Sequence, residues 1–143
     1  MQHEAAPGWE HFQHVADIGV RGSGRTLAEA FEQAALAMTA VIVDPAQLAE
    51  NEMVSVEVRA PDRELLLTEW LNTLIFEMAT QHLLFARFTV DIHGDTLSGT
   101  AWGERIDVKR HQPTVEIKGA TFTELRVWQS DDERWHAQCV VDV

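Results

Sequence analysis

Two carboxylates stand out because each lies among apolar residues and not in a charged stretch. Asp17 falls within residues 14–19 (His-Val-Ala-Asp-Ile-Gly), where small apolar neighbours surround a group that is costly to bury without a partner. Asp142 follows two valines, so alternation along a strand directs its side chain away from the face that Val141 and Val143 share. Both carboxylates are therefore candidates for chemistry.

Oxygen donors of this kind suit a hard cation. If Asp17, Asp142 and the terminal carboxylate at Val143 come together, they favour calcium, magnesium or manganese over zinc. His14 then stands close enough in sequence to act as an acid or base near neutral pH. The alternative for Asp17 is a turn-capping or surface role, and composition alone does not decide between the two.

The sequence lacks the common motifs of other catalytic and binding sites. The sequence has no phosphate-binding glycine motif, no Gly-x-Ser-x-Gly elbow and no His-Glu-x-x-His helix. The single cysteine, Cys139, lies in an apolar run typical of an inert core thiol, and it excludes an internal disulfide or a cysteine zinc site within one chain. A single cysteine without an internal disulfide fits a protein of the reducing cytoplasm. The other six histidines show no paired ligand spacing and are expected to be ordinary surface or hydrogen-bonded residues: His3, His11, His82, His93, His111 and His136.

Charge narrows the possible partners. Twenty-three acidic residues against eleven basic ones give a net charge of −12, so we expect no direct binding of nucleic acid, which depends on Lys and Arg. An acidic surface suits a cation or a basic protein partner. No signal peptide is visible, and no apolar run approaches the roughly 18 residues that a membrane span needs.

Two helices should position the candidate residues. Thr26 and Glu29 form a capping box that begins a helix, and its apolar stripe runs until Asp44 and Pro45 stop it. A second, leucine-rich helix follows residues 61–62 and runs to about Gln81.

The remaining chain predicts short strands. Trp9 to Arg21 is strand-like but bent or broken at Ala16-Asp17, and Gly22-Ser23-Gly24 predicts a turn. Further strands are expected at 53–60, in a hairpin of 85–92 with 96–102, around Val115 with Ile117, around Leu125 with Val127, and at 135–143. These elements predict an α+β fold, a largely antiparallel or mixed β-sheet with two amphipathic helices packed on it, in a single compact domain over 9–143 after a flexible N-terminus at 1–8.

Several blocks of the sequence resemble the archease family in the right order. Residues 14–19 are similar to the family pattern His-Thr-Ala-Asp-Ile-Gly. The other similar blocks are Thr26 to Phe31, Glu69 to Asn72, Ala101 to Glu104 and Val140 to Val143. The resemblance extends from about residue 9 to residue 143.

The resemblance implies a partner of the RtcB-type RNA ligase, which uses GTP and manganese in tRNA splicing or RNA repair. That ligase joins RNA ends with a 2′,3′-cyclic phosphate or 3′-phosphate to ends with a 5′-hydroxyl, and archease speeds formation of its guanylate intermediate. The family's metal-binding positions carry over to Asp17, Asp142 and Val143. Lys118 matches a family lysine, although it can equally be a solvated strand residue.

The chain departs from the family pattern in two places. Val15 replaces the usual threonine, and Thr121-Phe122-Thr123 stands where many members have Thr-Tyr-His. The favoured function is thus a non-enzymatic, metal-binding activator, with His14, Glu69 and Lys118 as possible partner-facing or supporting residues. The alternatives are a metal-dependent phosphoester hydrolase that uses Asp17 and Asp142, and a chaperone-like modulator of nucleic-acid-modifying enzymes.

Overall fold

The computed structural model describes residues 6–143, so most of the expected flexible segment at 1–8, and His3 with it, lies outside the described residues. Eight strands and two long helices make up the fold. The elements are β1 (Gly8–His14), β2 (Asp17–Gly24), α1 (Leu27–Ile42), η1 (Pro45–Gln47), β3 (Glu52–Arg59), α2 (Arg63–Gln81), β4 (Leu83–His93), β5 (Thr96–Arg105), α3 (Val108–His111), β6 (Gly119–Ala120), β7 (Arg126–Gln129) and β8 (Trp135–Asp142). None of the helices in this range is long and apolar enough to cross a membrane.

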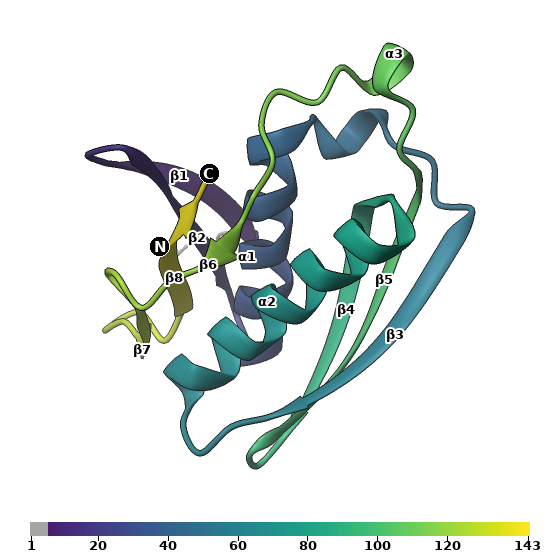
Figure 1. Cartoon of the computed structure of the whole chain (residues 1–143). Helices are drawn as coiled ribbons and strands as arrows, with labels where there is room; N and C mark the ends of the chain where they lie inside the picture. Colours follow the sequence, from purple (N-terminus) through teal and green to yellow (C-terminus); the bar gives the residue numbers. More distant parts are fainter. Residues whose placement is uncertain (1–5) are drawn as a thin grey trace.

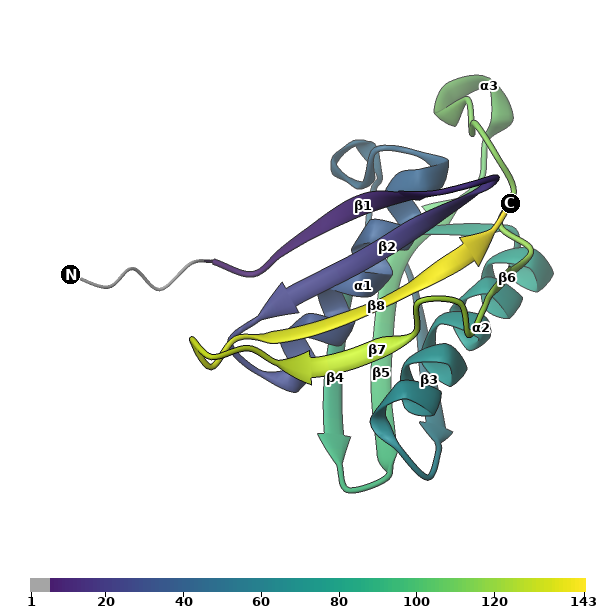
Figure 2. The same ribbon diagram turned by 90° about the vertical axis from the view of Figure 1, so that its left-hand side faces the viewer.

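The strands form two antiparallel sheets with the helices between them (Figures 1 and 2). Sheet A has the order β1-β2-β8-β6, with β7 also paired to β8, and sheet B has the order β3-β5-β4. Helix α1 packs against β2 and β8 on one side and β4 on the other. The predicted α+β class and both helices are confirmed, but the strands divide into two sheets instead of one.

The first two strands form a hairpin in which Val15 and Ala16 are the turn. The predicted break at Ala16-Asp17 is therefore a reversal of the chain. The predicted turn at Gly22-Ser23-Gly24 is wrong, because these residues continue β2 and pair with β1 and β8. The glycines serve helix packing: a Cβ on Gly22 would lie 2.1 Å from the backbone nitrogen of Ala34, so α1 rests directly on the strand backbone.

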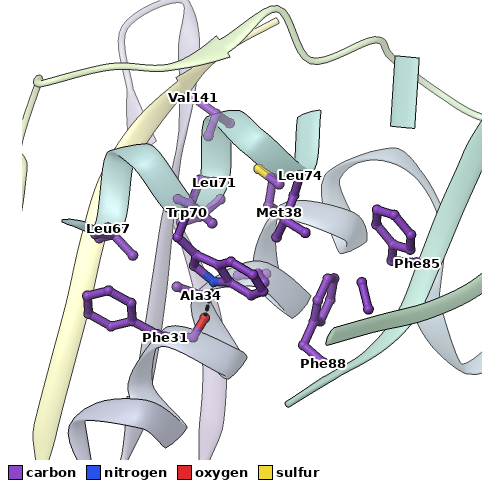
Figure 3. Packing of buried hydrophobic residues seen from close by; sticks show 14 of the residues in the cluster. Phe31, Ala34, Met38, Leu67, Trp70, Leu71, Leu74, Phe85, Phe88 and Val141 are labelled. Atoms are coloured by element: carbon purple, nitrogen blue, oxygen red, sulfur yellow. Dashed lines mark hydrogen bonds between the residues drawn. The ribbon is translucent and has the colours of Figure 1, made fainter. Parts of the chain in front are cut away.

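Both predicted helix starts are confirmed. Thr26 caps α1 by accepting from the Glu29 amide at 3.0 Å, and the Glu29 carboxylate accepts in return from the Arg25 amide at 2.8 Å. Asp62 caps α2 by accepting from the Leu65 amide at 2.8 Å. The helices meet where the buried Trp70 indole donates to the Phe31 carbonyl at 3.1 Å (Figure 3). This bond satisfies the only polar atom that Trp70 brings into the core.

A segment without regular structure, residues 112–118, runs from α3 across the ends of the two long helices to β6, and we call it the strap. The predicted strand around Val115 and Ile117 is wrong because the strap makes its bonds to a helix end. Thr114 donates from its amide to the Ile42 carbonyl at 3.0 Å and from its hydroxyl to the Val41 carbonyl at 2.9 Å. The free carbonyls at the end of α1 are satisfied in this way.

The strap is anchored at its start by the buried carboxylate of Glu104. Arg110 forms an ion pair with it, the Ala49 amide donates to it at 2.7 Å, and His111 Nε2 lies 3.2 Å away. His111 Nδ1 accepts from the Asp107 amide at 2.8 Å, so the neutral ring carries its proton on Nε2, toward Glu104. The bonds from Arg110 and Ala49 lower the pKa of Glu104 from 4.5 to about 2.

We expect Gly22→Ala to lower the free energy of unfolding by about 3 kcal/mol, because the added Cβ meets helix backbone that has no room to relax. Gly8→Ala is the matched control, since its Cβ meets nothing within 4 Å. Chemical denaturation measures both. Equal midpoints for the two variants would contradict the close approach of α1 to β2.

Acid should weaken the Glu104 anchor. Since the folded-state pKa lies below the unfolded value, this carboxylate stabilises the fold above pH about 4.5 and loses that contribution as pH falls toward 2. Glu104→Gln should cost about 1.5–3 kcal/mol at neutral pH and flatten the unfolding profile below pH 4.5. Glu57→Gln, on the exposed face of β3, is the control and should leave the profile unchanged.

Candidate functional site

The two carboxylates singled out from the sequence lie on neighbouring strands of sheet A. The pairing of β2 with β8 ends with Ile18 opposite Val141, and continuing this register by one residue would set Asp17 opposite Asp142. Residues directly opposite each other share a face, with Cβ atoms about 4.5–5.5 Å apart. The strand pairing therefore brings together side chains that are far apart in the sequence.

Two further residues complete a line across four strands. His14 pairs with Asp17 on the β1 side, and Gly119 pairs with Asp142 on the β6 side. We call His14, Asp17, Asp142 and Gly119 the carboxylate row. Figure 2 shows the β1–β2 turn, the end of β8 and β6 at the same end of the molecule.

His14 carries an unusual polar atom. Its Nδ1 is buried and has no hydrogen-bond partner among the described residues. Buried ring nitrogens are normally paired, so this nitrogen beside Asp17 has a hydrogen-bonding capacity that no described residue uses. A hollow of about 470 Å³ adjoins the ring, and it is lined by Phe12, Val15 and Asp17 among others.

Gly19 of the sequence pattern has a packing role beside the row. It pairs with Phe12, and a Cβ on Gly19 would lie 2.3 Å from the Phe12 ring. The Phe12 ring thus covers the backbone of β2 at Gly19, two residues along the strand from Asp17. The Arg21 guanidinium in turn lies over the Phe12 ring, 4.9 Å from the ring centre.

β6 brings Lys118 to the row. The Lys118 amide donates to the Asp142 carbonyl at 2.8 Å, and its side chain is exposed. β6 itself is held by Asn72 of α2, whose amide group accepts from the Ala120 amide at 2.9 Å and donates to the Ala120 carbonyl at 3.3 Å. One side chain of α2 therefore positions β6, the strand that directly follows Lys118.

The two remaining candidate residues, Val143 and Glu69, are not part of the carboxylate row. Val143 follows Asp142 directly and packs partly on the core. Glu69 is exposed on α2, one helical turn before Asn72. Over residues 6–143, no three side chains of His, Cys, Asp or Glu are gathered closely enough to hold a metal ion. A cation at the row would thus take its further ligands from backbone oxygens, water or another molecule.

The sequence matches the model of the Archease protein family (MTH1598/TM1083) over residues 9–143. The chain belongs to the archease family. It is 39% identical to Protein archease of Pyrococcus furiosus over 139 residues, which cover 94% of this chain and 98% of the relative. Protein archease of Methanosarcina barkeri is 34% identical over 140 residues, covering 94% and 95%.

Solved structures agree with the fold. The solution structure of protein 1598 from Methanobacterium thermoautotrophicum superposes with a TM-score of 0.83 at 36% identity, covering 95% of this chain and 99% of that one. A crystal structure from Thermotoga maritima, described as an archease and possible chaperone, has a TM-score of 0.58 at 18% identity with full coverage of both chains. The latter shows the shared fold alone.

The structure also identifies residues that sequence analysis passed over. Asn72 is the clearest, because a polar residue in the leucine-rich helix should have suggested a buried or edge-capping role. His136 is another: its ring nitrogens lie 2.8 Å from the hydroxyls of Ser23 and Ser130, and burial lowers its pKa. Cys139 is confirmed as a core thiol, since it is fully buried and burial raises its pKa to about 12.

We expect Asn72→Ala to free β6 from α2. The Ala120 amide, which bonds to Asn72 and not to β8, should then exchange its hydrogen about two- to tenfold faster, because an exposed hydrogen bond of about 0.5–1.5 kcal/mol is lost. Hydrogen exchange measured by NMR tests this, with Glu69→Ala on the same helix as control. Unchanged exchange at Ala120 would mean that β8 alone holds β6.

Proposed function

We propose that this chain is a metal-binding accessory protein that activates an RtcB-type RNA ligase by promoting its guanylylation and multiple turnover. The observation that carries the proposal is the register of β2 and β8, which ends with Ile18 opposite Val141, so that Asp17 and Asp142 are the next residues on the two strands at one end of sheet A. Membership of the archease family, together with the resemblance of these two positions to the family's metal-binding residues, supports the assignment.

The donors at the carboxylate row fit a hard divalent cation. Asp17 and Asp142 supply carboxylate oxygens, and Val143 adds backbone oxygen close by. Calcium, manganese and magnesium prefer such ligands, whereas zinc prefers nitrogen and sulfur. The orphaned Nδ1 of His14 also fits a site that holds a bound water or ion beside Asp17. When bound, the cation would offset negative charge on nucleotide phosphates.

An incomplete ligand set suits an accessory role. Two carboxylates on adjacent strands leave further coordination positions for water, phosphates or a partner's groups. The row lies at an exposed end of the molecule, with Asp142 open to solvent and Asp17 half-buried. Its carboxylates can therefore meet the active site of another protein.

Charge supports a protein partner over RNA. A net charge of −12 repels phosphate backbones and attracts a basic protein surface over roughly 8 Å at physiological salt. Lys118 is a cation beside the row, since its backbone bonds to Asp142. Its ammonium group is suited to a phosphate oxygen at the junction between the two proteins.

A metal-dependent phosphoester hydrolase is the second candidate. It is favoured by His14, which pairs with Asp17 in the row and is a residue type that commonly serves as a general acid or base. Purified protein that hydrolyses a phosphate ester with added metal, and loses this activity with Asp17→Ala, would favour the hydrolase. Stimulation of ligase guanylylation without hydrolysis would favour the activator.

We expect Asp17→Ala and Asp142→Ala each to abolish cation binding and ligase activation with little change in fold. Neighbouring carboxylates repel each other without metal, so the stability of the metal-free variants should stay level or rise slightly. The double variant should be little worse than either single one, because the two residues act as a unit. Calorimetric titration with calcium and manganese and a guanylylation assay at limiting ligase measure these effects.

Asp131→Ala is the matched control, because this exposed aspartate lies in the β7–β8 turn. Normal activation by both single variants would show that the row is not the working site. Attention would then move to His14, Glu69 and Lys118.

A further inference from the structure

A hollow lies beneath the strap, where the strap crosses the ends of α1 and α2 (Figure 1). Its lining comes from the C-terminal ends of both helices, the start of β4, Ile106 and the strap itself. Its volume is about 570 Å³. Small-molecule sites in proteins usually have volumes of roughly 300–1,000 Å³, so the hollow has the size of a ligand site. We call it the strap pocket.

Apolar side chains make up most of the lining of the strap pocket. Ile75 and Met78 of α2, together with Ile106, pack against the core on one side and leave part of their surface uncovered. The strap adds Ile117, which is 5% exposed, and Val115, which is 36% exposed. A hollow with such a lining is the usual form of a site that binds an apolar group.

The strap forms the roof of the pocket and is fixed at two points. The Thr114 amide donates to the last residue of α1 at 3.0 Å, and the Lys118 amide donates to the last residue of β8 at 2.8 Å. Glu116 lies between these two bonds and is exposed, and Ala79 and His82 are exposed on the α2 side of the pocket. The pocket is therefore open to solvent while the strap stays bonded at both points.

The charges at the strap pocket favour a cation. Among the described residues that line the pocket, Glu116 is the one acidic side chain, and none is Lys or Arg. The last turn of α2 reaches the pocket through Met78 and Ala79 and contains no basic residue. The C-terminal end of a helix carries a partial negative charge, which stabilises cations and repels anions. An ammonium group thus suits the mouth of the pocket, whereas a carboxylate would be repelled by Glu116.

We propose that the strap pocket binds a small organic cation with an apolar tail, of the alkylammonium class. The tail lies against Ile75, Met78 and Val115, and the ammonium group lies at the mouth, beside Glu116 and the C-terminal end of α2. This ligand differs from the divalent cation of the carboxylate row, and its binding does not depend on the proposed function.

The test compares three probes that have the same tail and differ in the charge of the head group: n-octylamine, n-octanol and octanoate. Each is titrated into the full-length chain at neutral pH while backbone and methyl NMR signals are recorded. We expect octylamine to shift the signals of lining residues, Ile75, Met78 and Ile106 among them, in a saturable way with a dissociation constant of about 0.1–1 mM. Octanoate should bind about tenfold more weakly, because its charge has the wrong sign.

Two variants separate the tail from the head group. Ala79→Trp fills the pocket and should weaken octylamine binding at least about tenfold, because the tail and the indole compete for one space. Thr80→Trp is the matched control, at an exposed α2 position outside the lining. Glu116→Gln should weaken octylamine binding about two- to fivefold and leave octanol binding unchanged, since an exposed ion pair contributes modestly. Glu57→Gln on β3 is its control.

Octylamine that gives no saturable shifts, or shifts that Ala79→Trp leaves unchanged, would overturn the strap pocket as a binding site. Octanoate that binds as tightly as octylamine, or octylamine binding that Glu116→Gln does not weaken, would overturn the cationic ligand. The comparison of head groups uses the parent protein, so it decides the ligand class even if a variant fails to fold. None of these measurements needs the ligase, so a failure of the proposed function leaves their outcome unaffected.

Discussion

The antiparallel pairing of β2 with β8 is the interaction on which the arrangement of this molecule depends. It joins the second strand to the last one and forms the centre of sheet A, with β1 on one side and β6 and β7 on the other. Because side chains alternate along a strand, a shift of one residue in this pairing would turn Asp142 toward the core and Val141 toward solvent. The apolar faces of the two strands exclude that shift.

Core packing against the inner face of sheet A stabilises the register of β2 and β8. Val20, Cys139 and Val141 are fully buried on the inner face of sheet A, and Gly22 lets α1 approach the strand backbone. Trp70 then ties α1 to α2 through its bond to Phe31, and Asn72 ties α2 to β6. The position of Lys118 beside Asp142 is thus the end of a continuous series of packed elements.

Local signals in the sequence predicted the parts that local physics decides. The capping residues Thr26 and Asp62 set both helix starts, and alternation identified β3 and the β4–β5 hairpin. The candidates Asp17 and Asp142 were recognisable because a carboxylate among apolar residues needs a partner. Their adjacency was not derivable from local pattern, since it depends on a pairing between opposite ends of the chain.

The two wrong predictions, the turn at residues 22–24 and the strand around Val115 and Ile117, have the same physical cause. Gly22 and Gly24 predicted a turn because glycine usually breaks a strand, but here they allow a helix to pack on one. Val115 and Ile117 alternate like a strand, yet the strap that contains them bonds to the end of α1. In both places a tertiary contact overrides the local preference, and a single sequence holds no record of that contact.

The long separation between the paired strands has a kinetic consequence. Arg21 and Gln138, which bond across β2 and β8, are 117 residues apart, whereas the strands of sheet B are connected through a short hairpin and one helix. Closing the loop between β2 and β8 costs more chain entropy than closing the β4–β5 hairpin. The contacts that offset this cost form only after most of the chain is ordered. Sheet B with its helices can therefore form early, and the two aspartates meet only when the central seam of sheet A closes. A population of molecules caught before that closure would have much of its secondary structure and none of its paired carboxylates.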